Sequence, residues 1–411
     1  MSSPLTILAG QRPQTAELVI RPAELPGVLV PGLYVHIPFC FHKCHYCDFY
    51  SITRQTPGRM RQFVDLILRE ANHWAGGTGP KVRPRTIFFG GGTPTLLPVD
   101  QMQRLIGELK NRFDFSAMNE FTVEANPATV TDEYCRMLAG AGINRLSFGA
   151  QSFDRAELAL LERHHDPDDV PRSLELARAA GFTRLNLDLI YGICGQSLTS
   201  WSRSLETAIQ LGTEHLSCYG LTYEPNTPLA VRKRLGRVQA MDEQVELSLA
   251  DYARRRLWRA GMPAYEISNF ARPGAECRHN LLYWTGGDYL GLGPSAASHV
   301  RGRRWRNRPH LGEWERAVGD GELPMIDVEH LSLRRRAGEL AMLSLRLNRG
   351  IVYADFSQRF NLDGRKLFAE PVERLTRMGF LQSDETGTRM TPSGWAVADS
   401  LAEEFLLSDD E

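Results

Sequence analysis

The chain lacks an excess of charge of either sign and lacks long apolar runs. It has 48 Lys plus Arg against 49 Asp plus Glu in 411 residues, which gives a formal net charge of -1. This balance excludes a broadly basic surface, so nucleic acid is not an expected partner. No apolar run approaches the ~18 residues of a membrane span, and no basic segment followed by a long apolar one opens the sequence. We therefore expect neither an integral membrane protein nor an exported one.

Cysteine is also scarce, with seven residues in the chain. An odd number without an export signal argues against a disulfide framework and favours reduced thiols, as in the cytoplasm. Three of them, Cys40, Cys44 and Cys47, nevertheless fall within eight residues at a CxxxCxxC spacing. We expect Cys135, in a predicted helix, and Cys218, in a predicted strand, to be core residues.

Short β-branched and aromatic segments alternate with longer amphipathic ones, which predicts βα units around a parallel sheet. Strands are predicted at residues 33–37, 86–89, 121–124, 145–148, 185–190 and 215–221. Helices are predicted at 60–74, 99–112, 131–141, 170–180 and 201–211. About six such units favour an α/β fold with a partial βα barrel, similar to a TIM barrel. Functional groups are then expected at the carboxyl ends of the strands.

Four segments are expected along the chain. Residues 1–30 have little periodicity and are predicted as an N-terminal extension, and residues 31–300 as the barrel domain. Residues 301–325, which begin with five arginines in eight residues, are predicted as a connector with a solvated basic face or a contact for acidic groups of a ligand. Residues 326–411 are predicted as a small winged-helix-like α+β domain. Its helices are expected at 331–345, 353–360 and 366–378, before a hairpin at 384–390.

The three clustered cysteines lie in a loop directly after the first predicted strand. Three thiolates on a short loop can each ligate one iron of a [4Fe-4S] cluster and leave the fourth iron open to a small molecule. Zinc is the alternative, since thiolates and the nearby His36, His42 and His45 would also suit it. No second cysteine or histidine pair follows at matched spacing, which weighs against zinc.

A glycine run, Gly90-Gly91-Gly92-Thr93-Pro94-Thr95, follows the second predicted strand. Backbone without Cβ atoms can approach a charged amino-acid group closely and donate hydrogen bonds to it. The glycine run and the cysteine loop together resemble the radical S-adenosylmethionine (SAM) superfamily. In that superfamily the methionyl group of SAM chelates the open iron, and an electron from the cluster cleaves SAM to a 5′-deoxyadenosyl radical.

Further motifs resemble the oxygen-independent coproporphyrinogen III oxidase group within that superfamily. They are EANP at 124–127, SFGAQS at 147–152, LERHH at 161–165, NLDLIYG at 186–192, YEISNFA at 265–271 and RHNLLYW at 278–284. The resemblance implies that Cys40, Cys44 and Cys47 hold the cluster. It implies SAM contacts from Tyr34, Gly91, Gly92, Thr93, Glu124, Gln151, Arg163 and Asp188. Carboxylates suit the ammonium and ribose hydroxyls of SAM, and a guanidinium suits its carboxylate.

Two details favour one branch of the group. Coproporphyrinogen III dehydrogenases have a fourth cysteine where this chain has Phe49, and they have a longer segment before the first cysteine than the 39 residues here. These details and the HNxxYW string resemble the family of heme chaperones. That resemblance implies heme carriage, with His279 as the iron ligand and Tyr283 and Trp284 as flat apolar surface.

The predicted function is therefore delivery of heme to acceptor proteins such as membrane or respiratory hemoproteins, with an electron donor for the cluster. Carriage of heme is preferred over enzymatic turnover of a porphyrin substrate. The alternatives are a coproporphyrinogen III dehydrogenase, which would decarboxylate two propionates, and a zinc-binding interaction protein. Cys277, two residues before His279, is expected to be a small buried residue.

Overall fold

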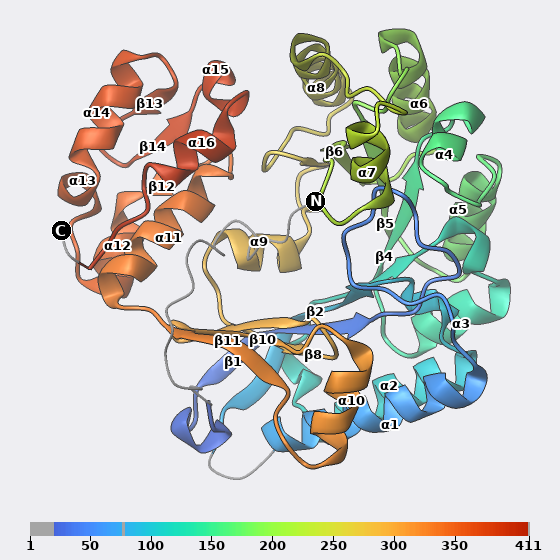
Figure 1. Cartoon of the computed structure of the whole chain (residues 1–411). Coiled ribbons are helices and arrows are strands. Elements are labelled where there is room, and N and C mark those ends of the chain that lie inside the picture. Colours follow the sequence, from blue (N-terminus) through green and yellow to red (C-terminus); the bar gives the residue numbers. More distant parts are fainter. Residues whose placement is uncertain (1–19, 76–78, 410–411) are drawn as a thin grey trace.

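One large sheet organises the part of the chain that the computed structural model describes, residues 20–75 and 79–409 (Figure 1). Its order is β11-β10-β9-β8-β1-β2-β3-β4-β5-β6-β7. Six strands form its centre: β1 (Leu29–Ile37), β2 (Lys81–Gly91), β3 (Glu120–Ala125), β4 (Arg145–Gln151), β5 (Arg184–Tyr191) and β6 (His215–Gly220). Each pairs in parallel with the next along the chain. Because all six overlap their predicted ranges, the partial βα barrel is confirmed.

Helices connect these strands, and Figure 1 shows α1 and α2 on the outer face of the sheet. They are α1 (Pro57–Trp74), α2 (Val99–Arg112), α3 (Asp132–Gly140), α4 (Arg155–Leu160), α5 (Asp169–Ala179) and α6 (Leu198–Gln210). Polar side chains fix where helices begin: the Arg59 amide donates to Thr56 Oγ1 at 3.2 Å, and the Ala156 amide donates to Asp154 Oδ1 at 2.9 Å. Such caps each stabilise a helix by about 1 kcal/mol.

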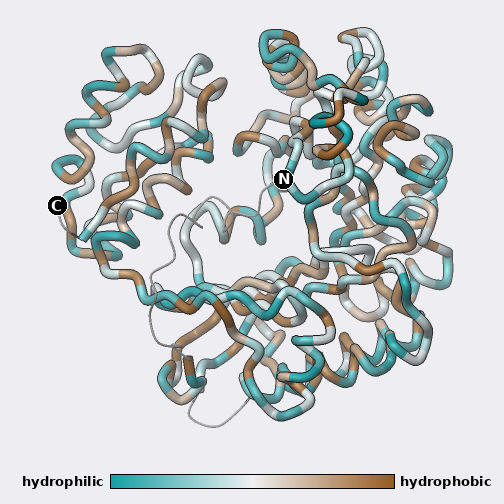
Figure 2. Tube along the Cα trace, viewed as in Figure 1, coloured by the Kyte–Doolittle hydropathy of each residue, from teal (hydrophilic) through white to brown (hydrophobic). Residues whose placement is uncertain are grey.

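Apolar side chains fill the space between the sheet and these helices. Phe63 on α1 and Phe89, Phe121 and Phe148 on three adjacent strands are fully buried in one core. Hydrophobic colouring follows the inner segments of the tube, and hydrophilic colouring follows many outer helix turns (Figure 2). Burial of each such ring stabilises the fold by roughly 2–3 kcal/mol, so this core holds the strand ends in a fixed arrangement.

The sheet continues past β1 on one side and past β6 on the other. β8 (Tyr289–Leu292) pairs in parallel with β1, and β7 (Asn269–Ala271) pairs antiparallel with β6. The sheet ends at β7 and β11, and these two edge strands do not pair with each other. The intervening helices are α7 (Pro228–Arg234), α8 (Glu243–Arg259) and α9 (Arg278–Trp284). The barrel is thus open within the described residues.

The prediction of a connector at residues 301–325 is wrong. This range holds β10 (Arg303–Asn307) and α10 (Leu311–Gly319), and β10 pairs antiparallel with β9 (Ala297–Val300) and β11 (Met325–His330). Three of its arginines pair with acidic side chains of the protein: Arg303 with Glu24 at 2.9 Å, Arg306 with Asp327 at 2.7 Å, and Arg304 with Glu329. Charged side chains are common on strands near a sheet edge, which explains why the strand resembled a polar linker.

A second, smaller core forms the C-terminal part. It surrounds a three-stranded sheet in the order β12-β14-β13. The elements are α11 (Leu333–Leu345), β12 (Ile351–Val352), α12 (Tyr353–Phe360), α13 (Gly364–Leu367), α14 (Ala369–Arg377), β13 (Leu381–Ser383), β14 (Gly387–Met390), α15 (Pro392–Trp395) and α16 (Ala398–Glu403). The predicted helix at 366–378 is two helices, because Phe368 leaves helical geometry with ψ 20°. Arg304 links the two parts through Glu339 on α11 at 2.9 Å.

The predicted N-terminal extension lies partly outside the described residues, since residues 1–19 are not among them. Of the remainder, Ile20, Leu25 and Val30 are buried in the main core. Among the described helices, none combines the length and the apolar character that a bilayer crossing needs.

Candidate functional site

The cysteine loop, residues 40–47, follows β1 directly. The Cys40 amide donates to Ile52 O at 2.9 Å, so the chain leaves the loop beside the point where it entered. Cys40 and Cys44 are 9% and 8% exposed, and Cys47 is half-buried. Burial, and after it the charges of Cys44 and Cys40, raise the pKa of Cys47.

Two side chains from other loops donate to these sulfur atoms. Thr93 Oγ1 donates to Cys40 Sγ at 3.8 Å, and Arg163 Nη1 donates to Cys44 Sγ at 3.6 Å. Arg163 is itself positioned by Gly149 O, to which Nη2 donates at 2.5 Å. Donors to sulfur favour the thiolate form and tune a metal held by it.

The donor set fits an iron–sulfur cluster held by three cysteines. Burial, followed by the charge of Cys44, raises the pKa of Cys47 to about 12. Near pH 7 the Cys47 thiol is therefore protonated unless positive charge lies beside it, as a metal centre provides. His36, named above for zinc, does not join this set: Nε2 donates to Tyr50 O at 2.9 Å and Nδ1 lies 3.1 Å from Tyr34 Oη.

The glycine run at the end of β2 lies against the start of the cysteine loop. The Gly92 amide donates to Ile37 O at 2.8 Å, and a Cβ atom on Gly92 would lie 2.6 Å from Phe39 O. Gly91 has φ +107°, a conformation that side chains rarely adopt. Only glycine therefore allows this turn to approach the backbone beside the cysteines so closely.

Two carboxylates lie on strands β3 and β5, toward their carboxyl ends. Glu124 ends β3 and accepts a hydrogen bond from the Gly91 amide at 3.2 Å. Asp188 on β5 accepts from Asn186 Nδ2 at 2.9 Å. Burial, followed by the charge of Asp188, raises the pKa of Glu124 to about 8, and burial raises the pKa of Asp188. A ligand cation such as an ammonium group would relieve this repulsion.

The remaining residues expected to meet SAM come from the same edge of the barrel. Tyr34 is half-buried on β1, and Gln151 ends β4 with φ 64°. The full set is Tyr34, Gly91, Gly92, Thr93, Glu124, Gln151, Arg163 and Asp188, and every member except Gln151 is partly exposed. The structure therefore gathers the expected residues on β1 to β5 and the loops that follow them, with side chains that solvent still reaches.

His279 on α9 has a different environment. It is 1% exposed, and its ring stacks on Phe88 with centroids 5.4 Å apart. Nδ1 lies 2.9 Å from Thr86 Oγ1 and Nε2 lies 2.8 Å from Tyr283 Oη. Burial lowers the pKa of His279 to about 4, so the ring is neutral near pH 7. In this conformation both ring nitrogens are engaged and neither is open to a heme iron.

The two aromatic residues expected to offer flat surface also contact neighbouring side chains. The Tyr283 ring lies edge-on to the Tyr289 ring, with centroids 4.6 Å apart. The Arg346 guanidinium lies over the Trp284 ring at 4.7 Å from its centroid. Both residues nevertheless remain partly exposed in this conformation.

A buried polar hub that the sequence did not reveal holds α9 in place. Glu120, fully buried at the start of β3, accepts hydrogen bonds from the Arg278 amide at 2.9 Å and the His279 amide at 3.0 Å. Arg184 pairs with the same carboxylate at 3.2 Å. Cys277 is fully buried beside it, as expected. The only sequence signal was a charged residue at the start of an apolar strand.

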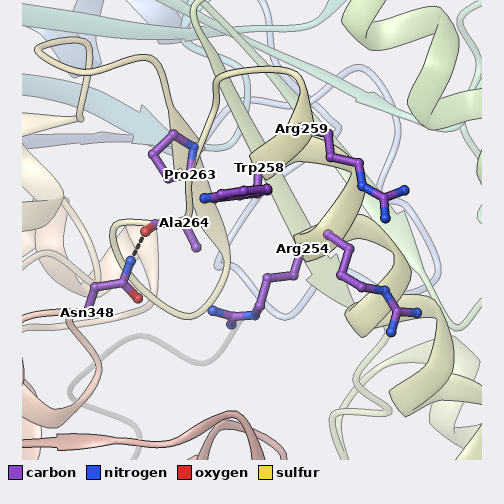
Figure 3. Close-up of a pocket in the computed structure, with 7 residues that line it drawn as sticks. Arg254, Trp258, Arg259, Pro263, Ala264 and Asn348 are labelled. Atoms are coloured by element: carbon purple, nitrogen blue, oxygen red, sulfur yellow. Dashed lines mark hydrogen bonds between the residues drawn. The ribbon is translucent and has the colours of Figure 1, made fainter.

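A basic pocket of about 410 Å³ lies elsewhere, between α8 and the C-terminal part (Figure 3). It is lined by Arg254, Arg255, Trp258, Arg259, Pro263, Ala264 and Asn348. Figure 3 shows Trp258 between Pro263 and the arginine side chains, with Asn348 bonded to Ala264. Arg254 also lies over the Trp395 ring at 3.9 Å. The pocket shares no residue with the expected SAM or heme contacts.

Comparison with known proteins agrees with this geometry. The radical SAM superfamily profile matches residues 34–208, and the HemN C-terminal domain profile matches residues 331–397. The solved structure of coproporphyrinogen III oxidase (HemN) from Escherichia coli is similar with a TM-score of 0.80 and 26% identity. That similarity covers 92% of this chain and 90% of HemN.

Curated relatives named heme chaperone HemW match over nearly their whole length. The protein of Lactococcus lactis is 32% identical over 92% of this chain and 97% of its own. The protein of Bacillus subtilis is 34% identical over 91% of this chain and 98% of its own. The radical SAM superfamily implies SAM and a [4Fe-4S] cluster as cofactors. With identity above 30% over nearly full lengths, the chain belongs to the HemW family of radical SAM proteins.

Proposed function

We propose that this protein binds heme and passes it to acceptor hemoproteins. We also propose that it keeps a cluster and SAM at the strand-end site, which is formed by the cysteine loop and the expected SAM contacts on β1 to β5. The main support for this proposal is Phe49, which lies two residues after Cys47 and is 38% exposed. Because this position holds no cysteine, the loop has three thiols. The similar porphyrinogen oxidases are expected to have a cysteine at this position. Relatives that share the chain almost end to end are named heme chaperones, which supports the same branch.

Each part of the strand-end site has a task in this proposal. Cys40, Cys44 and Cys47 would hold the cluster, and Arg163 would stabilise it through its bond to Cys44 Sγ. Glu124 and Asp188 would bind the ammonium and ribose groups of SAM, while the backbone of residues 91–93 and the Gln151 side chain would orient its methionyl part. When bound, the cluster and SAM supply one-electron chemistry at this edge of the barrel.

His279 is the proposed heme ligand, with Nε2 as its donor atom. Since this nitrogen bonds Tyr283 Oη at 2.8 Å, ligation requires that Tyr283 first move away. Such a movement would also separate the Tyr283 and Tyr289 rings and open the wall formed by α9. Heme entry would thus couple to a local opening, which suits a protein that must release its cargo.

The direct test uses the anaerobically reconstituted protein. We expect about four irons per chain, saturable heme binding, and a changed heme spectrum with lower affinity in His279→Ala. The protein is then incubated with SAM, a reductant and coproporphyrinogen III. Sustained formation of protoporphyrinogen IX would overturn the chaperone proposal in favour of the dehydrogenase that HemN represents. Zinc on the cysteines in place of iron would overturn both.

The partners and compartment belong to the same proposal. The expected partners are heme-accepting proteins, among them membrane or respiratory hemoproteins, and an electron donor for the cluster. All seven cysteines are free thiols, which supports a reducing compartment such as the cytoplasm.

A further inference from the structure

A group of side chains without an assigned task lies where two loops meet at the edge of the cluster site. His42 belongs to the cysteine loop, and Glu162 and His164 flank Arg163 in the segment between α4 and α5. Each offers a ligand atom, and these atoms all lie within 4.8 Å of one another. His42 Nε2 lies 3.5 Å from Glu162 Oε2, and the two imidazole centroids lie 4.3 Å apart at 74°.

These groups are available to a ligand. His42 Nε2 is shielded from solvent and has no hydrogen-bond partner among the described residues. The carboxylate of Glu162 faces it, and His164 is exposed beside them. When His42 is neutral, this nitrogen faces the Glu162 carboxylate at 3.5 Å without a hydrogen bond, and a metal ion between the two groups would satisfy both.

We propose that His42, Glu162 and His164 bind one divalent transition-metal ion of the zinc type, with a fourth position open to water. Zinc bonds of about 2.0–2.2 Å in tetrahedral geometry place ligand atoms roughly 3.3–3.5 Å apart. The His42–Glu162 pair already has this spacing. The other ligand-atom distances are at most 4.8 Å, so a small movement of the exposed His164 side chain completes the site, within reach of ordinary rotamer motion.

The donor types select the metal. Two imidazoles and one carboxylate suit zinc or ferrous iron, whereas magnesium and calcium prefer oxygen ligands alone. This site uses no thiolate, so it is separate from the cysteines and can be filled while they hold a cluster.

The position gives the metal a structural consequence. His42 lies between two cluster ligands, Cys40 and Cys44, and His164 follows Arg163, which donates to Cys44 Sγ at 3.6 Å. A bound ion would therefore tie the cysteine loop to the segment that carries Arg163. Its positive charge would also favour the reduced, more negative cluster.

The test uses the reconstituted protein with its cluster in place. One equivalent of zinc is added, unbound metal is removed by gel filtration, and iron and zinc are counted by mass spectrometry. We expect about one zinc per chain beside about four irons. X-ray absorption at the zinc edge should show nitrogen and oxygen neighbours near ~2.0 Å and no sulfur near ~2.3 Å.

His164→Ala carries the site assignment, because this exposed side chain can be removed without disturbing the core. We expect it to lose zinc while keeping the full iron count, and His330→Ala, an exposed histidine on β11, to keep both. Wild type that retains no zinc, His164→Ala that retains as much as wild type, or zinc with sulfur neighbours would each overturn the proposal. None of these outcomes alters heme binding, so failure here is distinct from failure of the chaperone function.

Discussion

The cysteine site and the His279 site were both expected from short motifs, yet they differ in how ready they are to bind. Around the cysteines, the predicted contacts at the strand ends are partly exposed, and two carboxylates repel each other. Around His279, both ring nitrogens are bonded and the ring is 1% exposed. The first site is preorganised and short of positive charge; the second is closed by its own hydrogen bonds.

This difference separates two kinds of binding. A preorganised site binds without a conformational cost, whereas a closed site reduces apparent affinity by the fraction of molecules that are open. A resident cofactor suits the first kind and a transferred cargo suits the second.

Cys47→Ser should abolish the cluster. Removal of one of three thiolates leaves too few ligands to hold a cluster, so iron should fall from about four per chain to below about one. Cys194→Ser is the matched control, since this half-buried thiol lies outside the loop. Iron analysis and the visible spectrum after reconstitution are the measurements. A full iron count in Cys47→Ser would show that the cysteine site was wrongly assigned.

Glu124→Gln should weaken SAM binding by roughly 10- to 100-fold, because a charge-assisted hydrogen bond to the ammonium contributes about 1.5–3 kcal/mol. Titration of the cluster-loaded protein with SAM measures the effect. Glu133→Gln, an exposed carboxylate on α3, is the control and should bind SAM as wild type does. Equal affinities in the two variants would contradict the assignment of Glu124.

Sequence reasoning succeeded where local pattern and function coincide. The six parallel strands are short β-branched and aromatic runs, and several motifs lie within their carboxyl-terminal halves or directly after them. Position along the chain therefore predicted position in the barrel. Phe63, Phe89 and Phe121 then hold those strand ends by burial alone.

It failed where structure depends on distant partners. β10 is a strand because β9 and β11 pair with it, and its sequence of three arginines in five residues gives no such signal. The enclosure of His279 depends on Thr86, nearly 200 residues away, with which it shares a 2.9 Å contact. A sequence motif can identify a candidate ligand residue, but it does not show which hydrogen bonds that side chain already makes.

Glu124 should also leave a pH signature on stability. Its pKa is about 8 in the folded protein, raised by burial and then by Asp188, against about 4.5 when unfolded. Between these values the folded state holds one more proton, so this contribution to stability is lost as pH rises toward 8, by at most about 1.4 kcal/mol per pH unit. Partial exposure of the side chain reduces that figure.

Comparison of wild type with Glu124→Gln isolates this effect, because the amide cannot titrate. The melting midpoint of the variant, relative to wild type, should be higher at pH 8 than at pH 6, with SAM absent from both samples. If the difference in melting midpoint between variant and wild type is the same at both pH values, Glu124 is already ionised at pH 6. The strand-end site would then have less unbalanced negative charge than we infer.

Tyr283→Phe tests the closed site by removing the hydroxyl that occupies His279 Nε2. Loss of one hydrogen bond worth about 1 kcal/mol from the closed form should raise heme affinity about fivefold. Tyr289→Phe is the control: its ring packs against Tyr283, but its hydroxyl has no hydrogen bond to His279. Heme titrations of both variants decide the point. Weaker binding in Tyr283→Phe than in Tyr289→Phe would show that the hydroxyl assists the bound state, and the contrast between an open and a closed site would then fail.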